Sequence, residues 1–549
     1  MNSVKLTPEL RDRAFRWIAD DVDADARTEL QTVLARAMGG EAEALAELED
    51  RMAGPLEFGT AGLRGPVRAG PNGMNSAVVI RTTAGVARWL VEDGRDGGTV
   101  VIGRDARHGS EAFATAAAEV LTAAGFDVRM LPGPLPTPVL AFAVKRFAAV
   151  AGIQITASHN PPADNGYKLY DSTATQIVPP SDARIEAAIA AAPGAVSVPR
   201  TPGFRVFGDE VLNEYLGKVA ELPRGTAREL RVAATALHGV GAKPLEAALN
   251  RAGFTDVHIV GEQATPDPDF PTVSFPNPEE PGATDLLLAL AEEKGADLAI
   301  ALDPDADRCA LGVRDRDGSW RMLRGDETGV LLGSHVLDTV SAPDPLVATT
   351  IVSSSMLAEI AKAHGARYQE TFTGFKWLAR AGDGLVFAYE EALGLCVNPD
   401  FVRDKDGIAA ATLACDLAAT LKAAGKSLVD SLDELAVRHG VYLTDQISVR
   451  VTDLSRIGAV MARLRATPPT GLAGLAVSTE DLLPEADVLR LRADGLRVVV
   501  RPSGTEPKLK AYLEVSEPVP DADSLADARR RAAGRLAALR SDLSPLLGS

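Results

Sequence analysis

The feature that most constrains the fold is a regular alternation of short β-rich runs with Ala- and Leu-rich helical stretches. A strand candidate at 99–102 precedes a helix candidate at 109–124, and one at 231–236 precedes a helix candidate at 243–252. The same alternation adds strands at 148–156, 297–302, 347–351 and 385–388, and a helix at 285–294. Strands that alternate with helices in this way predict α/β layers built on mostly parallel sheets.

The C-terminal part of the chain has a different pattern. Strand-like runs at 446–452, 489–501 and 510–515 lie close together, and a helix is predicted at 525–539 with Ser524 as its N-cap. Several strands followed by one helix indicate an α+β fold, so a separate C-terminal domain is expected. The length of 549 residues suggests three or four domains in all.

Composition excludes several classes of function. The 57 Lys and Arg residues against 75 Asp and Glu give a net charge of −18, which disfavours broad binding of nucleic acid or anionic membranes. Three cysteines, none in a CxxC pair, cannot build a disulfide framework or a thiolate zinc site and fit a reducing compartment. The charged N-terminus reads as a helix start at Thr7-Pro8, not as a signal peptide. We therefore expect a cytoplasmic protein without a membrane segment.

The first motif with chemical content is Thr-Ala-Ser-His-Asn-Pro-Pro at 156–162, directly after a predicted strand. Ligands of α/β proteins gather at the carboxyl ends of such strands. Ser158 is therefore a candidate nucleophile, and a solvated polar turn is the alternative. The glycines of a lipase-type nucleophile elbow are absent, so a serine that carries phosphate would need a metal or cation partner.

A second motif, Asp-Pro-Asp-Ala-Asp-Arg at 303–308, follows the apolar run 298–302. Three carboxylates at alternate positions after a strand can converge on one hard divalent cation. An EF-hand is disfavoured, because Arg308 and Arg314 stand where that loop needs Gly and Glu. The hypothesis of a haloacid-dehalogenase phosphatase is weakened, because Asp307 stands where the motif of those enzymes has Thr or Val. An acidic surface turn is the remaining alternative.

A third motif, Arg-Pro-Ser-Gly-Thr-Glu-Pro at 501–507, resembles a phosphate nest of hydroxyl and N–H groups, with Arg501, Lys508 and Lys510 as cations. It lacks the P-loop pattern, and a Pro/Gly turn is the alternative. Glu390 and Glu391 follow another strand and could accept sugar hydroxyls, or could complement a helix dipole. Loops around 58–65, 103–107 and 373–376 are weaker signals, and surface cations are the usual explanation of their Arg and Lys residues.

In this combination the chain resembles the α-D-phosphohexomutase superfamily over nearly its whole length. The stretches 58–65, 374–377, 390–394 and 402–407 look most like the branch that contains type-2 phosphoglucomutases and phosphopentomutases. The resemblance implies four domains around a central cleft: three related α/β units and a C-terminal α+β unit similar to the TATA-binding-protein fold. With the candidate boundaries along the chain, the expected domains are 1–208, 209–318, 319–438 and 439–549.

The resemblance also assigns roles. It implies that Ser158 is the phosphoserine and that a phosphoserine oxygen holds one Mg²⁺ together with Asp303, Asp305 and Asp307. Lys168 matches a lysine thought to act in proton transfer, and Arg64 and His159 match residues near the phosphoserine. The expected substrate-binding residues are Arg308, Lys376, Glu390, Arg501, Ser503, Gly504, Thr505 and Lys510.

The expected reaction moves a phosphoryl group between C1 and the terminal carbon of a sugar phosphate through a sugar bisphosphate, which also serves as primer. Glucose phosphates are the first expectation and mannose phosphates the second. Ala392 stands where hexose-specific relatives commonly have Ser, so a phosphopentomutase or a sugar-1,6-bisphosphate synthase stays open, as does a metal-dependent phosphatase. A non-catalytic sensor is disfavoured by the intact motifs. We expect a monomer or weak dimer that binds small sugar phosphates.

Overall fold

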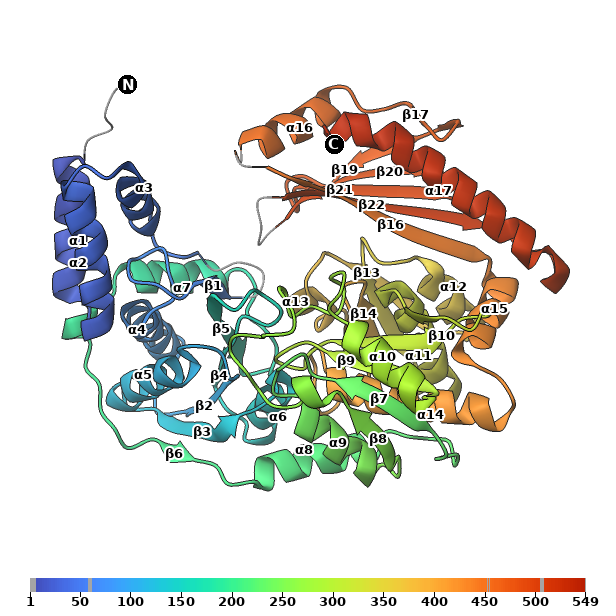
Figure 1. Cartoon of the computed structure of the whole chain (residues 1–549), viewed down its shortest axis with the longest axis horizontal. Helices are drawn as coiled ribbons and strands as arrows, with labels where there is room; N and C mark the ends of the chain where they lie inside the picture. Colours follow the sequence, from blue (N-terminus) through green and yellow to red (C-terminus); the bar gives the residue numbers. More distant parts are fainter. Residues whose placement is uncertain (1–5, 58–61, 452, 454, 504–507, 549) are drawn as a thin grey trace. The chain divides into compact units, whose positions relative to one another are not determined.

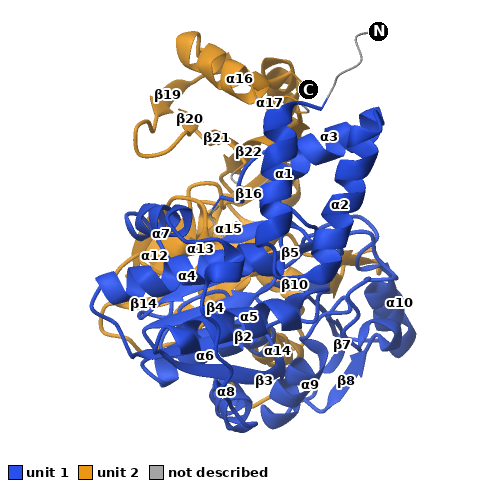
Figure 2. Cartoon of the chain, turned by 90° about the vertical axis from the view of Figure 1, so that its left-hand side faces the viewer, with its two compact units in different colours: residues 1–223, 229–312, 398–412 blue, residues 224–228, 313–397, 413–549 orange. Residues whose placement is uncertain are grey.

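The computed structural model describes residues 6–57, 62–451, 453, 455–503 and 508–548. The chain divides into two compact units, which Figure 2 colours separately. The first contains residues 1–223, 229–312 and 398–412, and the second contains residues 224–228, 313–397 and 413–549. Each unit is described by itself.

The first unit begins with three helices and a six-stranded sheet in the order β1-β5-β4-β2-β3-β6 (Figure 1). The side chain of Thr7 accepts a hydrogen bond from the Leu10 N–H and caps α1, so the predicted helix start is confirmed. The elements are α1 (Pro8–Asp20), α2 (Ala24–Met38), α3 (Ala42–Arg51), β1 (Leu63–Pro66), α4 (Ser76–Glu92), β2 (Thr99–Arg104), α5 (Ser110–Ala123), β3 (Asp127–Pro134), α6 (Thr137–Arg146), β4 (Ala151–Ile155), β5 (Asp164–Asp171), α7 (Ser181–Ala190) and β6 (Arg205–Val206).

The central strand of this sheet, β4, is buried along its whole length. Its parallel neighbour is β2, and its antiparallel neighbour is β5. Ile153 packs with α4 and α5 in one core cluster, whereas a Cβ at Gly152 would lie 2.3 Å from a methyl carbon of Val144 in α6. Helices therefore cover both faces of the sheet, which explains why every residue of β4, including the polar Gln154, is buried.

The second sheet of this unit contains β10-β9-β7-β8, in which β9 pairs with β7 in parallel and with β10 antiparallel. Its buried strand β9 reads Leu-Ala-Ile-Ala-Leu, as expected for a strand that is covered on both faces. The elements are α8 (Glu210–Ala220), β7 (Arg231–Thr235), α9 (Ala242–Arg251), β8 (Asp256–Ile259), α10 (Asp285–Lys294), β9 (Leu298–Leu302) and β10 (Cys309–Arg314).

The second unit holds a four-stranded sheet in the order β13-β12-β14-β15, with β12 parallel to both β13 and β14. The elements from residue 320 to residue 439, of which α14 begins in the first unit, are β11 (Trp320–Met322), α11 (Gly325–Thr339), β12 (Leu346–Thr350), α12 (Met356–Ala363), β13 (Arg367–Thr371), α13 (Phe375–Leu378), β14 (Leu385–Glu390), β15 (Gly394–Cys396), α14 (Gly407–Ala423) and α15 (Leu428–His439).

An antiparallel sheet in the order β16-β22-β21-β20-β19 ends the chain, and α17 packs along it (Figure 1). This is the α+β pattern that the sequence predicts. Its elements are β16 (Val441–Arg450), α16 (Ser455–Ala466), β17 (Gly471–Leu472), β18 (Leu475–Ala476), β19 (Ser478–Asp481), β20 (Leu489–Ala493), β21 (Leu496–Pro502), β22 (Lys508–Glu517) and α17 (Leu525–Leu547).

Two local expectations differ from the structure. The run 489–501 is not one strand but two, because Asp494-Gly495 forms a tight turn in which Gly495 has a φ of +65°. Ser524 does occupy the N-cap position of α17, but its hydroxyl does not cap the helix. Instead it donates to the carboxylate of Asp521, which lies before a short 3₁₀ turn.

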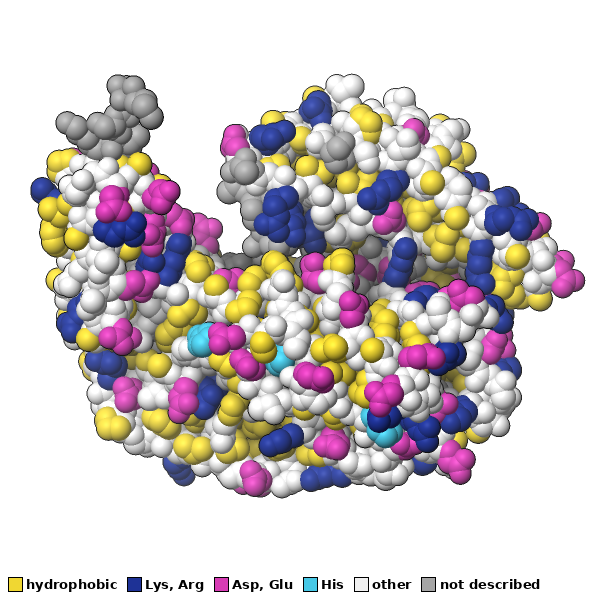
Figure 3. Space-filling view, viewed as in Figure 1, with side chains coloured by type: hydrophobic (Ala, Val, Ile, Leu, Met, Phe, Trp, Pro, Cys, Tyr) yellow, Lys and Arg dark blue, Asp and Glu magenta, His cyan; other side chains and the backbone are white. Residues whose placement is uncertain are grey.

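No single helix in the described part of the chain is long and apolar enough to cross a membrane, although the bent pair α14 and α15 passes by length and composition together. On the face shown in Figure 3, acidic and basic side chains are interspersed.

Candidate active site

The predicted nucleophile, Ser158, lies in the loop that follows β4, where its side chain is 1 % exposed. Its φ of +52° is a left-handed value that non-glycine residues rarely adopt. The Thr156 hydroxyl accepts the Ser158 N–H at 2.9 Å, and Ser158 Oγ donates to Asp303 Oδ2 at 2.8 Å. The strained backbone thus holds the hydroxyl against a carboxylate of the second motif.

Arg107 holds this loop in place, contrary to the expectation that the cations of the 103–107 loop lie at the surface. It is 4 % exposed, and its guanidinium donates to the carbonyl oxygens of Ser158, Asn160, Pro161 and Asp164 at 2.5–3.1 Å. A planar guanidinium with five N–H groups can satisfy several carbonyls of one tight loop at once. The Asp-x-Arg spacing after a strand was the available signal, but burial could not be read from it.

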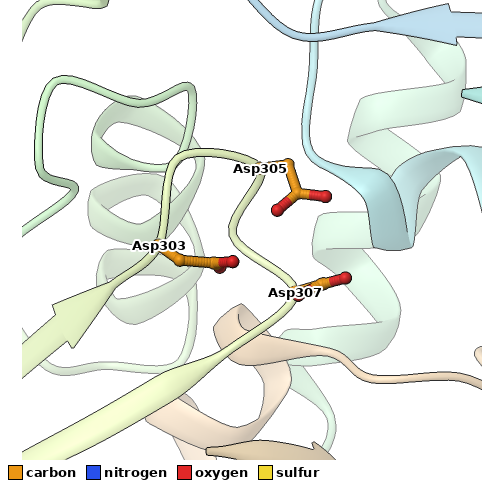
Figure 4. A group of neighbouring side chains, drawn as sticks. All are labelled: Asp303, Asp305 and Asp307. Carbon is orange, nitrogen blue, oxygen red and sulfur yellow. The ribbon is translucent and has the colours of Figure 1, made fainter. Parts of the chain in front are cut away.

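The three aspartates of the second motif come together on the loop after β9, and their carboxyl groups turn to one side of it (Figure 4). One ligand oxygen from each lies within 4.8 Å of the other two, and all three residues are fully buried. Lys168 Nζ donates to Asp305 Oδ2 at 2.7 Å and to Asp307 Oδ2 at 2.9 Å. Thr137, which the sequence analysis missed, donates to Asp305 Oδ2 at 2.6 Å.

The charges of this group influence one another strongly. Burial and the two neighbouring carboxylates raise the pKa of Asp303 well above its usual range. Burial would also raise the pKa values of Asp305 and Asp307, but the Lys168 ammonium outweighs this effect. Both pKa values therefore lie below the usual range. Although burial opposes its charge, the two carboxylates raise the pKa of Lys168. The neighbouring cations Lys405 and Arg64 would lower the pKa of Lys168, but the two carboxylates outweigh them.

The other predicted residues of this region lie around the same loop. His159 Nδ1 is 3.3 Å from Ser158 Oγ, and burial together with the Arg308 and Arg64 cations lowers the pKa of His159 well below its usual value. Arg64 donates to Asn160 Oδ1 at 3.2 Å. The backbone N–H of Arg308 donates to Asp303 Oδ1 at 3.0 Å. The site thus combines a neutral imidazole with two guanidinium groups.

A further cation comes from the stretch 402–407. Lys405 Nζ lies 3.4 Å from Asp307 Oδ2, and its side chain is 9 % exposed. Its neighbour Asp404 accepts a hydrogen bond from the buried Tyr170 hydroxyl at 2.8 Å. The sequence gives no role to Lys405, because only the fold brings this residue to the loop after β9.

The remaining predicted residues belong to the second unit. Glu390 ends β14, Lys376 lies in α13, and its ammonium is 5.7 Å from the ring centre of Trp377. Arg501 is paired with Lys510 across β21 and β22, and the Ser503 N–H donates to the carbonyl of Lys508. Gly504 and Thr505 lie outside the described residues.

Glu391 is a residue whose environment the sequence did not reveal. Its carboxylate accepts hydrogen bonds from the hydroxyls of Ser353 at 3.0 Å and Thr350 at 3.3 Å. Burial, with the nearby charges of Glu390 and Asp326, raises the pKa of Glu391 to about 7. A carboxyl group that titrates near neutral pH therefore adjoins the predicted sugar-binding residue.

A buried serine hydroxyl, a cluster of three carboxylates and surrounding cations form the kind of site used by enzymes that transfer phosphoryl groups.

Comparison with known proteins supports the same class of enzyme. Family models match in order along the chain: phosphoglucomutase/phosphomannomutase α/β/α domain I at 55–194, domain II at 213–318, domain III at 324–438 and the C-terminal domain at 447–532.

Among curated relatives, a probable phosphomannomutase of Haemophilus influenzae is 44 % identical over 82 % of this chain and 95 % of its own. The human phosphopentomutase is 33 % identical over 87 % of each chain. The crystal structure of a phosphoglucomutase/phosphomannomutase family protein from Burkholderia thailandensis has a TM-score of 0.67 at 20 % identity, over 89 % of this chain and 97 % of that one.

The chain belongs to the phosphoglucomutase/phosphomannomutase family. It has the four-domain architecture of that family, with three α/β/α domains and a C-terminal α+β domain, and it is a phosphosugar mutase, an isomerase that moves a phosphoryl group within a sugar phosphate.

Proposed function

We propose that the mutase carries the phosphoryl group on Ser158 and interconverts glucose 1-phosphate and glucose 6-phosphate. The observation that supports this most strongly is the buried Ser158 hydroxyl 2.8 Å from Asp303, in a group of three carboxylates and one ammonium. Phosphorylated Ser158 gives its phosphoryl group to the free hydroxyl of the bound monophosphate. The resulting bisphosphate reorients in the site and returns its other phosphoryl group to Ser158. A sugar bisphosphate can therefore also prime the enzyme.

The three aspartates fit one Mg²⁺ ion. Asp305 Oδ1 and Asp307 Oδ1 have no hydrogen-bond partner among the described residues, and carboxylate oxygens are the ligands that Mg²⁺ prefers. We propose that Asp303, Asp305, Asp307 and the phosphoserine hold it. When bound, Mg²⁺ offsets the negative charge on the transferring phosphoryl group.

The remaining roles follow from charge and position. Lys168 keeps its proton at Nζ in the resting site, so we assign it the role of proton donor to the departing Ser158 Oγ. The amine that remains then accepts the proton that the attacking sugar hydroxyl releases. Arg64, Arg308 and neutral His159 stabilise the phosphoryl group beside Ser158. In the second unit, Glu390 and Lys376 contact the sugar, while Arg501, Ser503, Gly504, Thr505 and Lys510 hold the phosphate that does not react.

Pentose phosphates are a second candidate substrate class. Ala392 lacks the hydroxyl of hexose-specific relatives, and the human relative is named a phosphopentomutase. The test is a panel of glucose, mannose, ribose and deoxyribose 1-phosphates, each assayed with its bisphosphate primer for the isomerised product and for inorganic phosphate. We expect the highest kcat/KM with glucose 1-phosphate. A higher value with a pentose phosphate would overturn the glucose assignment, and inorganic phosphate as the main product would overturn the mutase.

We also propose that the protein acts in the cytoplasm as a monomer or weak dimer. Size-exclusion chromatography with light scattering measures the second point, and a stable higher oligomer would contradict it.

A further inference from the structure

A cavity of about 860 Å³ lies in the first unit, and its lining includes none of the proposed catalytic residues. It forms where α1 meets β1, α4 and α7, and both views show these helices close together (Figures 1 and 2). Its volume is within the range of small-molecule sites. Part of its wall comes from residues before 55, where the match to family domain I begins.

One part of the wall carries three arginines. Arg13 and Arg16 lie one turn apart on α1, and Arg81 comes from α4 with its guanidinium carbon 5.9 Å from the ring centre of Trp17. Arg81 Nε is buried without a hydrogen-bond partner, and none of the three arginines forms an ion pair with another described residue. Unpaired guanidinium groups around a cavity favour an anion, and phosphate takes two parallel hydrogen bonds from each.

The rest of the wall has a different character. It includes the apolar side chains of Met52, Leu56, Leu63, Val78 and Ile189, which suit a flat ring. Glu57 and Glu186 supply carboxylates that can accept hydrogen bonds from ligand hydroxyls. Asp20 already accepts the Ala195 N–H at 2.9 Å.

We propose that this cavity is a binding site for a nucleoside monophosphate. The phosphate of such a ligand meets the arginines, its ribose hydroxyls meet the two glutamates, and its base lies against the apolar wall. A bare sugar phosphate would leave the apolar wall without a partner. The site is distinct from the Ser158 site.

Strand β1 connects this cavity with the Ser158 loop. Leu63 lines the cavity, whereas the next residue, Arg64, donates to Asn160 beside Ser158. Leu63 is also paired with Tyr167, whose hydroxyl is 3.2 Å from that of Thr83 on α4. A ligand in the cavity therefore contacts a strand that carries a residue of the phosphoryl-transfer site, and its binding stabilises β1.

The experiment is equilibrium dialysis of the full-length protein with AMP, adenosine or inorganic phosphate, in the presence of excess glucose 1,6-bisphosphate. Wild type is compared with Arg81→Gln and with Arg88→Gln, an exposed arginine on the same helix that pairs with Glu92 at 2.7 Å. We expect saturable AMP binding to wild type and Arg88→Gln. Arg81→Gln should bind AMP about tenfold more weakly, because a charge-assisted hydrogen bond is lost. Adenosine and inorganic phosphate should each bind more weakly than AMP.

A second readout needs no turnover, so it succeeds or fails independently of the proposed reaction. AMP should slow amide hydrogen exchange in peptides that contain residues 63–66 of wild type, and should do so less in Arg81→Gln. The absence of AMP binding at millimolar concentration, equal binding to wild type and Arg81→Gln, or equal binding of adenosine and AMP would overturn the site. Unchanged exchange in β1 with AMP bound would overturn the stabilisation of that strand.

Discussion

At the scale of single residues, the molecule depends on side chains whose burial does not follow from their type. Ser158 and the three aspartates were predictable, because their spacing after apolar strands carries a chemical meaning. Arg107 and Thr137 were not, since an arginine in a polar loop is usually exposed and one threonine gives no signal. Their partners lie far away in the sequence, and only the folded sheets bring them together.

Arg107 provides a test at this scale. Arg107→Lys removes most of the hydrogen bonds to the carbonyls of the Ser158 loop, and a displaced nucleophile lowers the rate of phosphoryl transfer. We expect kcat to fall by about 10- to 100-fold with KM nearly unchanged, because a displacement of about 1 Å can cost 10²-fold in rate. Steady-state kinetics measure both constants. The matched control is Arg104→Lys, which affects an ion pair with Glu111 and a long hydrogen bond to the carbonyl of Asp105, but no hydrogen bond to the Ser158 loop. An unchanged kcat for Arg107→Lys would contradict its positioning role.

At the scale of elements, the pattern of apolar residues predicted the existence of strands and helices better than it predicted where they begin and end. The alternation of strands and helices gave the α/β sheets, and the buried strand β9 was recognisable from its unbroken apolar run. The Asp494-Gly495 turn was overlooked because apolar residues flank it on both sides. The predicted side-chain cap by Ser524 was wrong, because its hydroxyl donates to Asp521 instead. Composition does not determine which of these two local hydrogen bonds forms.

The loop after β9 gives a prediction about metal. Removal of divalent cations with excess chelator should abolish mutase activity, because the three carboxylates then face the phosphoryl group without the divalent cation that offsets the charge on both. Added Mg²⁺ should restore activity. Binding of Mg²⁺ measured by calorimetry should be lost in Asp305→Asn, whereas Asp315→Asn, in the turn after β10, should bind as wild type does. Full activity in excess chelator would rule out the metal role.

The strand β14 ends beside a carboxyl group that links stability to pH. The pKa of Glu391 is about 7 in the folded protein and about 4.5 when unfolded, so the folded state binds more protons between these values. The stability of wild type therefore falls as pH rises from about 4.5 through 7. The variant Glu391→Gln does not lose stability in this way. Its free energy of unfolding should therefore rise relative to that of wild type by on the order of 1–3 kcal/mol between pH 5 and pH 8.

Thermal unfolding of the two proteins across this pH range measures the difference. The exposed Glu359→Gln on α12 is the control and should follow wild type. A difference in Tm between Glu391→Gln and wild type that stays constant with pH would show that Glu391 does not titrate as described.

At the scale of the whole molecule, the family match covers four consecutive domains, and the first unit by itself brings the Ser158 loop to the three aspartates. The net charge of −18 gave no hint of this site, because the cations around the Ser158 loop are few and local. Sequence motifs predicted the reaction class, whereas the identity of the sugar depends on a few loop contacts that the motifs do not specify.

The central claim is that Ser158 carries the phosphoryl group. Its most direct test is incubation of the enzyme with glucose 1,6-bisphosphate labelled in its phosphates, followed by digestion and mass spectrometry of the peptide that contains Ser158. We expect label on Ser158 of wild type. In Ser158→Ala we expect no label and a loss of mutase turnover by several orders of magnitude, while the protein stays folded. Label on another residue, or near-normal turnover of Ser158→Ala, would contradict it.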